Sequence, residues 1–235
     1  MTYTLLGRCS RTGQLGIAVA TYSLAVGAHV PLILPHAGMI ATQAFGNPTL
    51  RAIGGPLLAA GYTAESVLAQ LQAADAKIGF RQVAVMDRRG AGACWTGEHC
   101  RPWAGHEIAQ DVIACGNVLV GPDVVTAMKE AFFATAELPL ADQLLAGIEA
   151  GRDAGGQQGS AGHLPERSAS LLVHADEAHP LVDLRVDLSD DAVGELRALH
   201  DTYRPYVAFR ELRWRDPEQA PPQEKFVASL GGNAG

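Results

Sequence analysis

The helical patterns in this sequence come in pairs, and segments with the character of short strands separate the pairs. Residues 48–60 and 63–71 form the first pair, and residues 121–132 and 141–151 form the second. A chain that alternates single strands with single helices forms a doubly wound parallel sheet, which this order disfavours. We therefore predict an α+β fold, a four-layer αββα sandwich with two mostly antiparallel sheets between helix pairs.

Apolar periodicity places the individual elements. In the clearest helix, Ala64, Val67, Leu68 and Leu71 follow the i, i+3, i+4, i+7 pattern, and Thr63 is a good N-cap. A last helix is predicted from residue 190 to about residue 203. Strands are predicted at residues 3–6, 15–22, 39–44, 81–86, 91–95, 111–115, 168–174 and 181–188.

The strand at residues 15–22 has one bulky and one very small face. Leu15, Ile17 and Val19 alternate with glycine and alanine. Small residues on one face of a strand allow another element to approach its backbone closely. We therefore expect close packing on that face.

Two segments lack such patterns. Residues 153–166 are rich in glycine and polar residues, which predicts a mobile loop. The segment from Asp216 onward contains several prolines and glycines and is expected to be loose. We predict a single domain over residues 1–210, followed by a C-terminal extension or tail over residues 211–235.

Charge and composition limit the classes of partner, cellular location and cofactor that we expect for this chain. The net charge of -7 argues against a nucleic-acid partner, because such surfaces are usually basic. The most apolar stretch, residues 24–40, is interrupted by Pro31 and Pro35, so we expect no membrane span. The cysteines lack metal-site spacing, and the histidines show no paired metal motif. No signal-like segment opens the chain, so we expect a cytoplasmic protein. We also expect no metal and no cofactor.

Several short segments carry a resemblance to a known family. They are Thr2–Arg8, Gly13–Ala20, Val26–Ala28, Ala41–Ala44, Asn47–Pro48, Thr96–Gly97, Cys100–His106, Gly116–Leu119 and Asp183–Asp187. Over roughly residues 2–200, the chain resembles a bacterial family of unknown function within the N-terminal nucleophile (Ntn) hydrolase superfamily, which is distantly similar to proteasome subunits. The resemblance is specific for the family and much less specific for a reaction.

The resemblance implies a mechanism that centres on the start of the chain. In an Ntn hydrolase, the first residue of the mature chain attacks an amide carbonyl, and its own α-amino group accepts the proton. Thr2 fits this role if Met1 is removed. The alternative interpretation is that Thr2 is an ordinary β-branched strand residue. The early lysine of proteasome-type sites is missing here, because no lysine precedes Lys77.

Six further residues are candidates for the site. Thr42 and Gln43 lie late in a strand, where related enzymes place donors beside the nucleophile, and Asn117 can donate to an oxyanion. Ordinary strand and turn hydrogen bonding is the alternative for these three. Arg8 can hold an anion, His29 can act as a base, and His106 can lie at a pocket mouth. A structural or surface role is the alternative for both histidines.

Two functional hypotheses follow. The first is an amide-bond hydrolase that acts on a small molecule through Thr2. The second is a catalytically inactive relative that keeps the sandwich as a binding or assembly module. We also expect a homo-oligomer, because closed homodimers are the commonest assemblies of soluble proteins.

Overall fold

The computed structural model describes residues 1–231 and separates the chain into two compact units. The first unit spans Met1–Arg197, and the second begins at Ala198. No helix among the described residues combines the length and apolar character that crossing a membrane requires.

The larger sheet of the first unit has six antiparallel strands in the order β12-β11-β2-β1-β8-β7. In that order the strands are Val182–Val186, Ser168–His174, Leu15–Thr21, Thr2–Arg8, Val112–Asn117 and Ala104–Ala109. The first strand of the chain, β1, is therefore central, with β2 on one side and β8 on the other.

The second sheet has four antiparallel strands in the order β3-β4-β5-β6. These strands are Pro31–Leu34, Gly38–Ala44, Arg81–Asp87 and Gly92–Thr96. The remaining small elements of the unit are α1 (Val26–His29), the 3-10 helix η1 (Ile78–Phe80) and a separate hairpin of β9 (Gln157–Gly159) and β10 (Gly162–Leu164).

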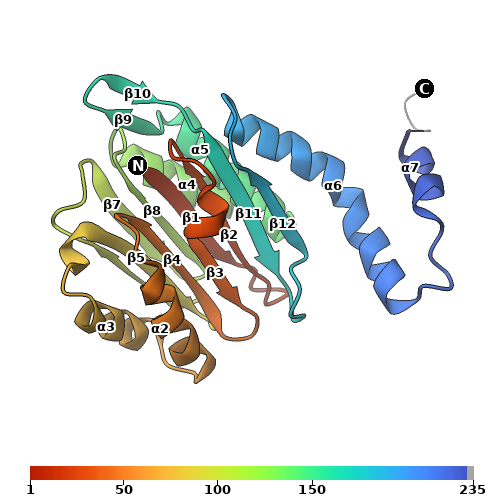
Figure 1. The fold of residues 1–235 in the computed structure, drawn as a ribbon, viewed down its shortest axis with the longest axis horizontal. Coiled ribbons are helices and arrows are strands. Elements are labelled where there is room, and N and C mark those ends of the chain that lie inside the picture. Colours follow the sequence, from red (N-terminus) through yellow and green to blue (C-terminus); the bar gives the residue numbers. More distant parts are fainter. Residues whose placement is uncertain (232–235) are drawn as a thin grey trace. The chain divides into compact units, whose positions relative to one another are not determined.

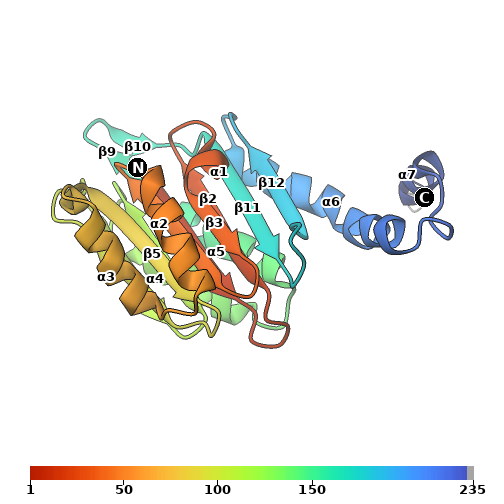
Figure 2. The ribbon, with the colours of Figure 1, turned by 60° about the horizontal axis from the view of Figure 1, so that its bottom comes forward.

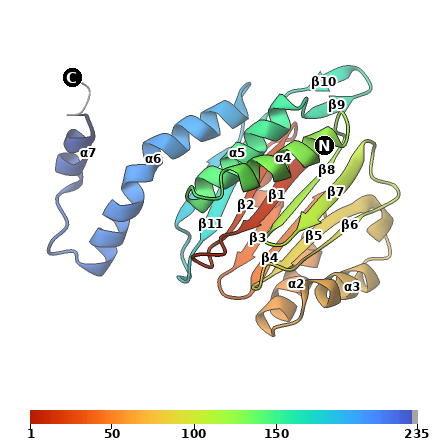
Figure 3. The ribbon, with the colours of Figure 1, turned by 180° about the vertical axis from the view of Figure 1, so that it is seen from behind.

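Two helix pairs cover the outer faces of the two sheets. Helices α2 (Pro48–Ala59) and α3 (Ala64–Ala74) pack on the four-stranded sheet, as Figure 2 shows. Helices α4 (Asp123–Ala134) and α5 (Leu140–Asp153) pack on the six-stranded sheet, in front of it in Figure 3. The layers are therefore helix pair, sheet, sheet, helix pair (Figure 1). The predicted α+β sandwich is confirmed.

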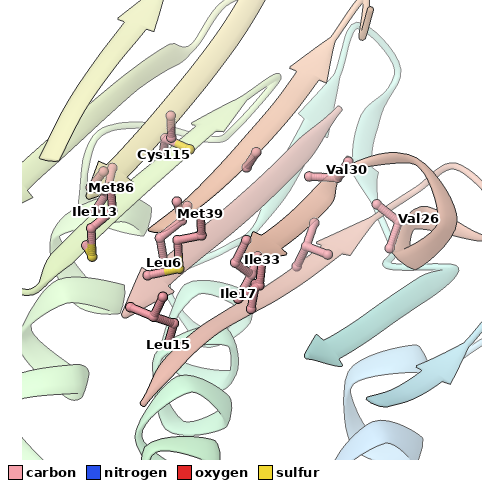
Figure 4. Packing of buried hydrophobic residues seen from close by; sticks show 13 residues of the cluster. Leu6, Leu15, Ile17, Val26, Val30, Ile33, Met39, Met86, Ile113 and Cys115 are labelled. Carbon is pink, nitrogen blue, oxygen red and sulfur yellow. The ribbon is translucent and has the colours of Figure 1, made fainter. Parts of the chain in front are cut away.

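The core between the sheets follows from the two-residue period of the strands. Leu6 and Ile17 point from the larger sheet toward Met39 and Met86 of the smaller one, and all four side chains are fully buried (Figure 4). A second cluster, which includes Ile40 and residues of α2 and α3, lies on the other face of the smaller sheet. Both faces of that sheet are therefore covered.

The small face of β2 packs as expected. Gly7 of β1 lies directly opposite Gly16 of β2. A Cβ atom at Gly7 would come within 2.5 Å of Phe132, and one at Gly16 within 2.4 Å of Leu144. These two glycines therefore allow α4 and α5 to approach the sheet closely.

The N-caps of the first helix pair are visible in the sequence. The predicted cap Thr63 accepts a hydrogen bond from the backbone N–H of Ser66, and Asn47 accepts one from Thr49 at the start of α2. Both caps satisfy donors that a helix N-terminus otherwise leaves unpaired.

Several sequence predictions need correction. The strand at 104–109 was missed, because its outward positions are polar or half-exposed at a sheet edge. The strand at 31–34 was missed because it begins with proline, which suits an edge position. Residues 157–164 form a hairpin inside the segment predicted as a mobile loop. The last helix is longer than predicted, as α6 (Ala192–Arg215).

The described residues of the second unit form two helical segments joined by residues 216–222. It contains the part of α6 after Arg197 and a further helix, α7 (Gln223–Gly231), where a loose tail was expected. The rings of Phe209 and Phe226 stack with centroids 3.9 Å apart, and Tyr206 meets both rings edge-on. Aromatic packing of this kind gives a short helical segment apolar contacts despite its many prolines.

Candidate active site

A row of polar residues crosses the six-stranded sheet at the end where β1 begins. Thr2 of β1 lies opposite Asn117 of β8, and the β1–β2 register continues from Tyr3 and Ala20 to Thr2 and Thr21. Thr2 has the same parity as the inward-facing Leu6, so its side chain points into the space between the sheets. The strand period thus brings Thr2, Thr21 and Asn117 together on one face.

A second polar row lies opposite, on the four-stranded sheet. Gln43 of β4 pairs in register with Gln82 of β5, which pairs with Thr96 of β6. Gln43 and Gln82 are buried. Two buried amides in adjacent strands require partners, because an unpaired buried polar group is costly.

Gln82 joins the two rows. Its amide nitrogen donates to Thr96 Oγ1 at 2.9 Å and to the carbonyls of Gly105 and Gly116 at 3.1 and 2.9 Å. Its amide oxygen accepts from Gln43 Nε2 at 2.8 Å and from Asn117 Nδ2 at 3.0 Å. Gln82 is therefore the centre of a buried network that fixes the orientation of both amides.

The Thr2 side chain lies in a compact group of oxygen atoms. Its hydroxyl donates to the carbonyl of Met1 at 2.5 Å and lies 3.2 Å from the hydroxyl of Thr21. The Thr21 hydroxyl donates to the same Met1 carbonyl. The peptide bond before Thr2 is thus held by two hydroxyl groups.

The chain terminus itself is bound by the network. The terminal nitrogen of Met1 donates to Asn117 Oδ1 at 2.6 Å. Burial lowers the pKa of this amine from 8.0 to about 6, and the nearby Arg101 charge acts in the same direction. At neutral pH the amine is therefore mostly uncharged.

A cavity of about 280 Å³ opens beside Thr2. Its floor consists of buried residues from both sheets, from α1 and from the C-cap of α1, namely Thr2, Thr21, Val26, Val30, Thr42 and Gln43. Ser23, Leu24 and His29 lie at its exposed mouth. The cavity therefore meets the network at Thr2 and Gln43.

Thr42 is distinct among the floor residues. Its side chain is 2% exposed, and its hydroxyl has no hydrogen-bond partner among the described residues. The hydroxyls of Thr2 and Thr21 and the amide of Gln43 all have protein partners. Thr42 alternates with Gln43 along β4 and pairs with Val83, so its side chain lies on the face that α2 and α3 cover.

The sequence of the chain matches one known protein family. A family described as "Family of unknown function (DUF1028)" matches residues 2–196. The chain belongs to this family. The predicted resemblance to a family of unknown function is confirmed, and no curated protein matches the chain.

Solved structures agree with this assignment. Protein SPO2555 from Silicibacter pomeroyi, described as a DUF1028 protein, is 31% identical over 86% of this chain and 88% of its own, with a TM-score of 0.78. Anbu (ancestral beta-subunit) from Yersinia bercovieri is 11% identical over 94% of this chain and 98% of its own, with a TM-score of 0.41. BPH from Thiobacillus denitrificans is 13% identical over 76% of this chain and 100% of its own, with a TM-score of 0.43. The last two are too distant to support an argument about this chain.

Most of the candidates named from the sequence of this DUF1028 protein gather at one end of the sandwich. Thr2, Thr42, Gln43 and His29 line the cavity, and Asn117 binds the terminal amine.

Two candidates lie farther away. The Nδ1 atom of His106 is 2.9 Å from Thr96 Oγ1, so His106 is linked to the network through Thr96 and Gln82. Burial lowers the pKa of His106. Arg8 lies at the opposite end of β1, where it forms an ion pair with Asp111 at 2.9 Å. The structure therefore does not bring Arg8 to the cavity.

Sequence reasoning missed Thr21 and Gln82. Thr21 ends a strand of alternating residues, and its position on the same face as Ile17 was a usable signal. Gln82 is the polar second residue of an otherwise apolar strand. Its role depends on the register between the strands, which the sequence alone does not reveal.

The groups at the site favour nucleophilic and proton-transfer chemistry. They are hydroxyls, amides and one amine of lowered pKa. Among residues 1–197, no three His, Cys, Asp or Glu side chains lie close enough together to share an ion. We therefore assign no residue of this site to a metal.

Proposed function

We propose that this DUF1028 protein is an Ntn-type hydrolase that cleaves an amide bond in a small molecule. Thr2 is the nucleophile once Met1 has been removed. The observation that carries the proposal is the cavity beside the Thr2 hydroxyl, at the first strand of an αββα sandwich. Its volume suits a small molecule rather than a protein segment.

The proposed reaction uses groups of Thr2 for both the attack and the proton transfer. The Thr2 oxygen bonds to the amide carbon while the free Thr2 amine takes the hydroxyl proton. Collapse of the tetrahedral intermediate breaks the carbon–nitrogen bond, and the proton passes to the leaving amine. Water then hydrolyses the ester on Thr2 and regenerates the hydroxyl.

Burial can lower the pKa of the Thr2 amine, the effect that the early lysine has in proteasome-type sites and that this chain lacks. A base must be uncharged to accept a proton, and burial already lowers the pKa of the Met1 amine to about 6. The Thr2 amine would occupy the next position in the chain, where Thr2 is 7% exposed. We expect the same environment to keep that amine uncharged at neutral pH.

The N-terminal mass of protein from its own organism tests the proposal most directly. Loss of Met1 is expected, because small second residues such as Thr permit its removal. Complete retention of Met1 would remove the proton acceptor and end the proposed mechanism.

Variants at Thr2 provide the second test. We expect T2A to abolish hydrolysis of small amides and T2S to retain it, because serine keeps the hydroxyl and the amine. Alanine and serine are both small enough for Met1 removal, so processing stays matched. The surface variant T202V serves as the control, because Thr202 is exposed and outside the first unit.

A binding or assembly module without catalysis is the second candidate. It is favoured by the bonds of Met1, whose amine and carbonyl both have partners in the network. Retained Met1 together with ligand binding would support this function. Light scattering of the purified protein would test the homo-oligomer that an assembly role requires.

A further inference from the structure

Strand β12 ends the six-stranded sheet and pairs on one side only. Among the described strands its neighbour is β11, and its other edge faces no strand (Figure 1). Such an edge presents backbone N–H and C=O groups that can pair with a further strand, unless its side chains prevent this. The side-chain pattern of β12 therefore decides whether the edge is blocked or is suited to a partner.

The two faces of β12 differ in character. Val182 and Leu184 are buried and Val186 is half-buried, whereas Asp183 and Arg185 are exposed. A partner strand that fits this edge must therefore be apolar on one face and carry complementary charges on the other.

The two exposed charges of β12 have opposite signs and are accessible. Asp183 forms no ion pair among the described residues, and Arg185 has an exposed pair with Asp187 at 3.5 Å. The stem of Arg185 lies against α1, because a Cβ at Gly27 would come within 2.7 Å of Arg185 Cδ. The Arg185 side chain is nevertheless 41% exposed, so both charges can reach a neighbouring strand.

A second β12 strand meets these requirements in an antiparallel register centred on Leu184. This register pairs all five strand residues, and it places Asp183 opposite Arg185 of the partner subunit and Val182 opposite Val186 of the partner subunit. A centre at Asp183 or at Arg185 would instead place like charges opposite each other, which is destabilising. A shift by one residue would place apolar residues opposite charged ones.

We infer that β12 pairs antiparallel with β12 of a second copy of this chain, in a twofold-symmetric dimer with two Asp183–Arg185 pairs across the interface. The occupant is a second copy because the strand complements its own charge pattern, as an isologous interface requires. Pairing of the two edges joins both six-stranded sheets into one continuous sheet. The inference concerns assembly and does not depend on hydrolysis by Thr2.

Sedimentation velocity of the full-length protein tests the dimer over concentrations from about 1 µM to about 1 mM. A five-residue strand edge is small beside the roughly 1,200–2,000 Å² that stable interfaces bury. We therefore expect a reversible dimer with a dissociation constant on the order of tens of micromolar.

Charge reversal tests the register. D183R and R185D each place like charges opposite each other at both pairs, so we expect each variant to associate at least about tenfold more weakly. The control is R88D, which makes the same charge change as R185D at an exposed position in the turn between β5 and β6 and should associate as the unaltered protein does. Thermal unfolding of each variant verifies that it is folded.

Mixing the two reversed variants provides the rescue. In a mixed dimer of D183R and R185D, opposite charges face each other again at both pairs. We expect the mixture to associate within about threefold of the unaltered protein, and the double variant D183R/R185D to do the same. A fluorescent label on one variant reports the mixed species during sedimentation.

Three outcomes would overturn the inference. They are a monomer throughout the concentration range, a dimer that folded D183R leaves unchanged, and folded single variants that fail to associate when mixed. The second outcome would also result from a register centred on Val186, in which Asp187 instead of Asp183 lies opposite the partner's Arg185.

Discussion

One residue, Gln82, holds the polar network of the site together. It is fully buried and bonds to five groups of the network. Methionine has a similar length but cannot make these bonds, so Q82M leaves Gln43, Asn117 and two carbonyls short of partners. Each unsatisfied buried group costs roughly 1–3 kcal/mol, with some relief from rearrangement. We expect Q82M to lower the free energy of unfolding by about 3 kcal/mol.

Chemical denaturation measures this loss. The control is Q70M, because Gln70 is exposed on α3 and its replacement should change stability by no more than about 0.5 kcal/mol. Similar stability of Q82M and Q70M would mean that the network contributes little to the fold.

The terminal amine predicts a pH dependence. Its pKa is about 6 in the folded chain and 8.0 when unperturbed, so the unfolded chain binds more protons between these values. Stability should therefore rise as pH increases from about 6 to 8, and this contribution should be absent below that window. Protein that retains Met1, verified by mass, is compared with its N-terminally acetylated form, which lacks the ionisable amine. Parallel stability curves for the two forms would contradict the lowered pKa.

At this scale the sequence predicts the site in part. Gln43 and Asn117 are brought to the end of the sandwich where Thr2 lies, because they occupy strand ends on the facing sheet and the neighbouring strand. Thr42 also lines the cavity, but its side chain shares the other face of β4 with Ile40. Arg8 is six residues beyond Thr2 in an extended strand, a separation of roughly 20 Å, so strand geometry places it away from the cavity. Gln82 could not be identified, because its partners come from segments whose register is set only in the fold.

Secondary-structure elements approach one another closely at the Gly7–Gly16 pair. A Cβ at Gly7 meets the Phe132 ring, and one at Gly16 meets Leu144 at 2.4 Å and Val173 at 3.2 Å. In such a packed contact an added methyl group forces side chains or helices to shift, which typically costs about 1–3 kcal/mol. We expect G7A and G16A each to be destabilised by that amount.

Thermal unfolding of a third variant isolates the packing effect. Gly121 has open space at its Cβ position and no positive φ angle, so G121A should be neutral or slightly stabilising. If G16A matched G121A, the close approach of α5 to β2 would not be required for stability.

The elements recovered from sequence are those with clear periodicity. The helices around Val67 and Leu144 and the strand at 168–174 were placed well, because each has an apolar face that the sandwich buries. The edge strands at 31–34 and 104–109 were missed. Such strands bury less apolar surface, so their patterns are weaker.

On the scale of the whole molecule, two independent observations place a domain boundary at nearly the same residue. The family match ends at residue 196, and the first compact unit ends at Arg197. Helix α6 runs across this boundary, and its buried residues Ala192, Val193 and Leu196 belong to the first unit. The helical turn after Arg197 should therefore be kept when the chain is shortened.

Pro205 offers a natural end for a shortened chain. Proline lacks a backbone N–H, so ending the chain at Arg204 removes no hydrogen bond donated by residue 205. We expect residues 1–204 to unfold in one cooperative transition, within a few degrees of the full chain. Calorimetry measures both the cooperativity and the midpoint temperature. Because the αββα layers and the cavity lie within the first unit, aggregation or a gradual transition of the shortened chain would show that the sandwich needs its C-terminal helices to fold.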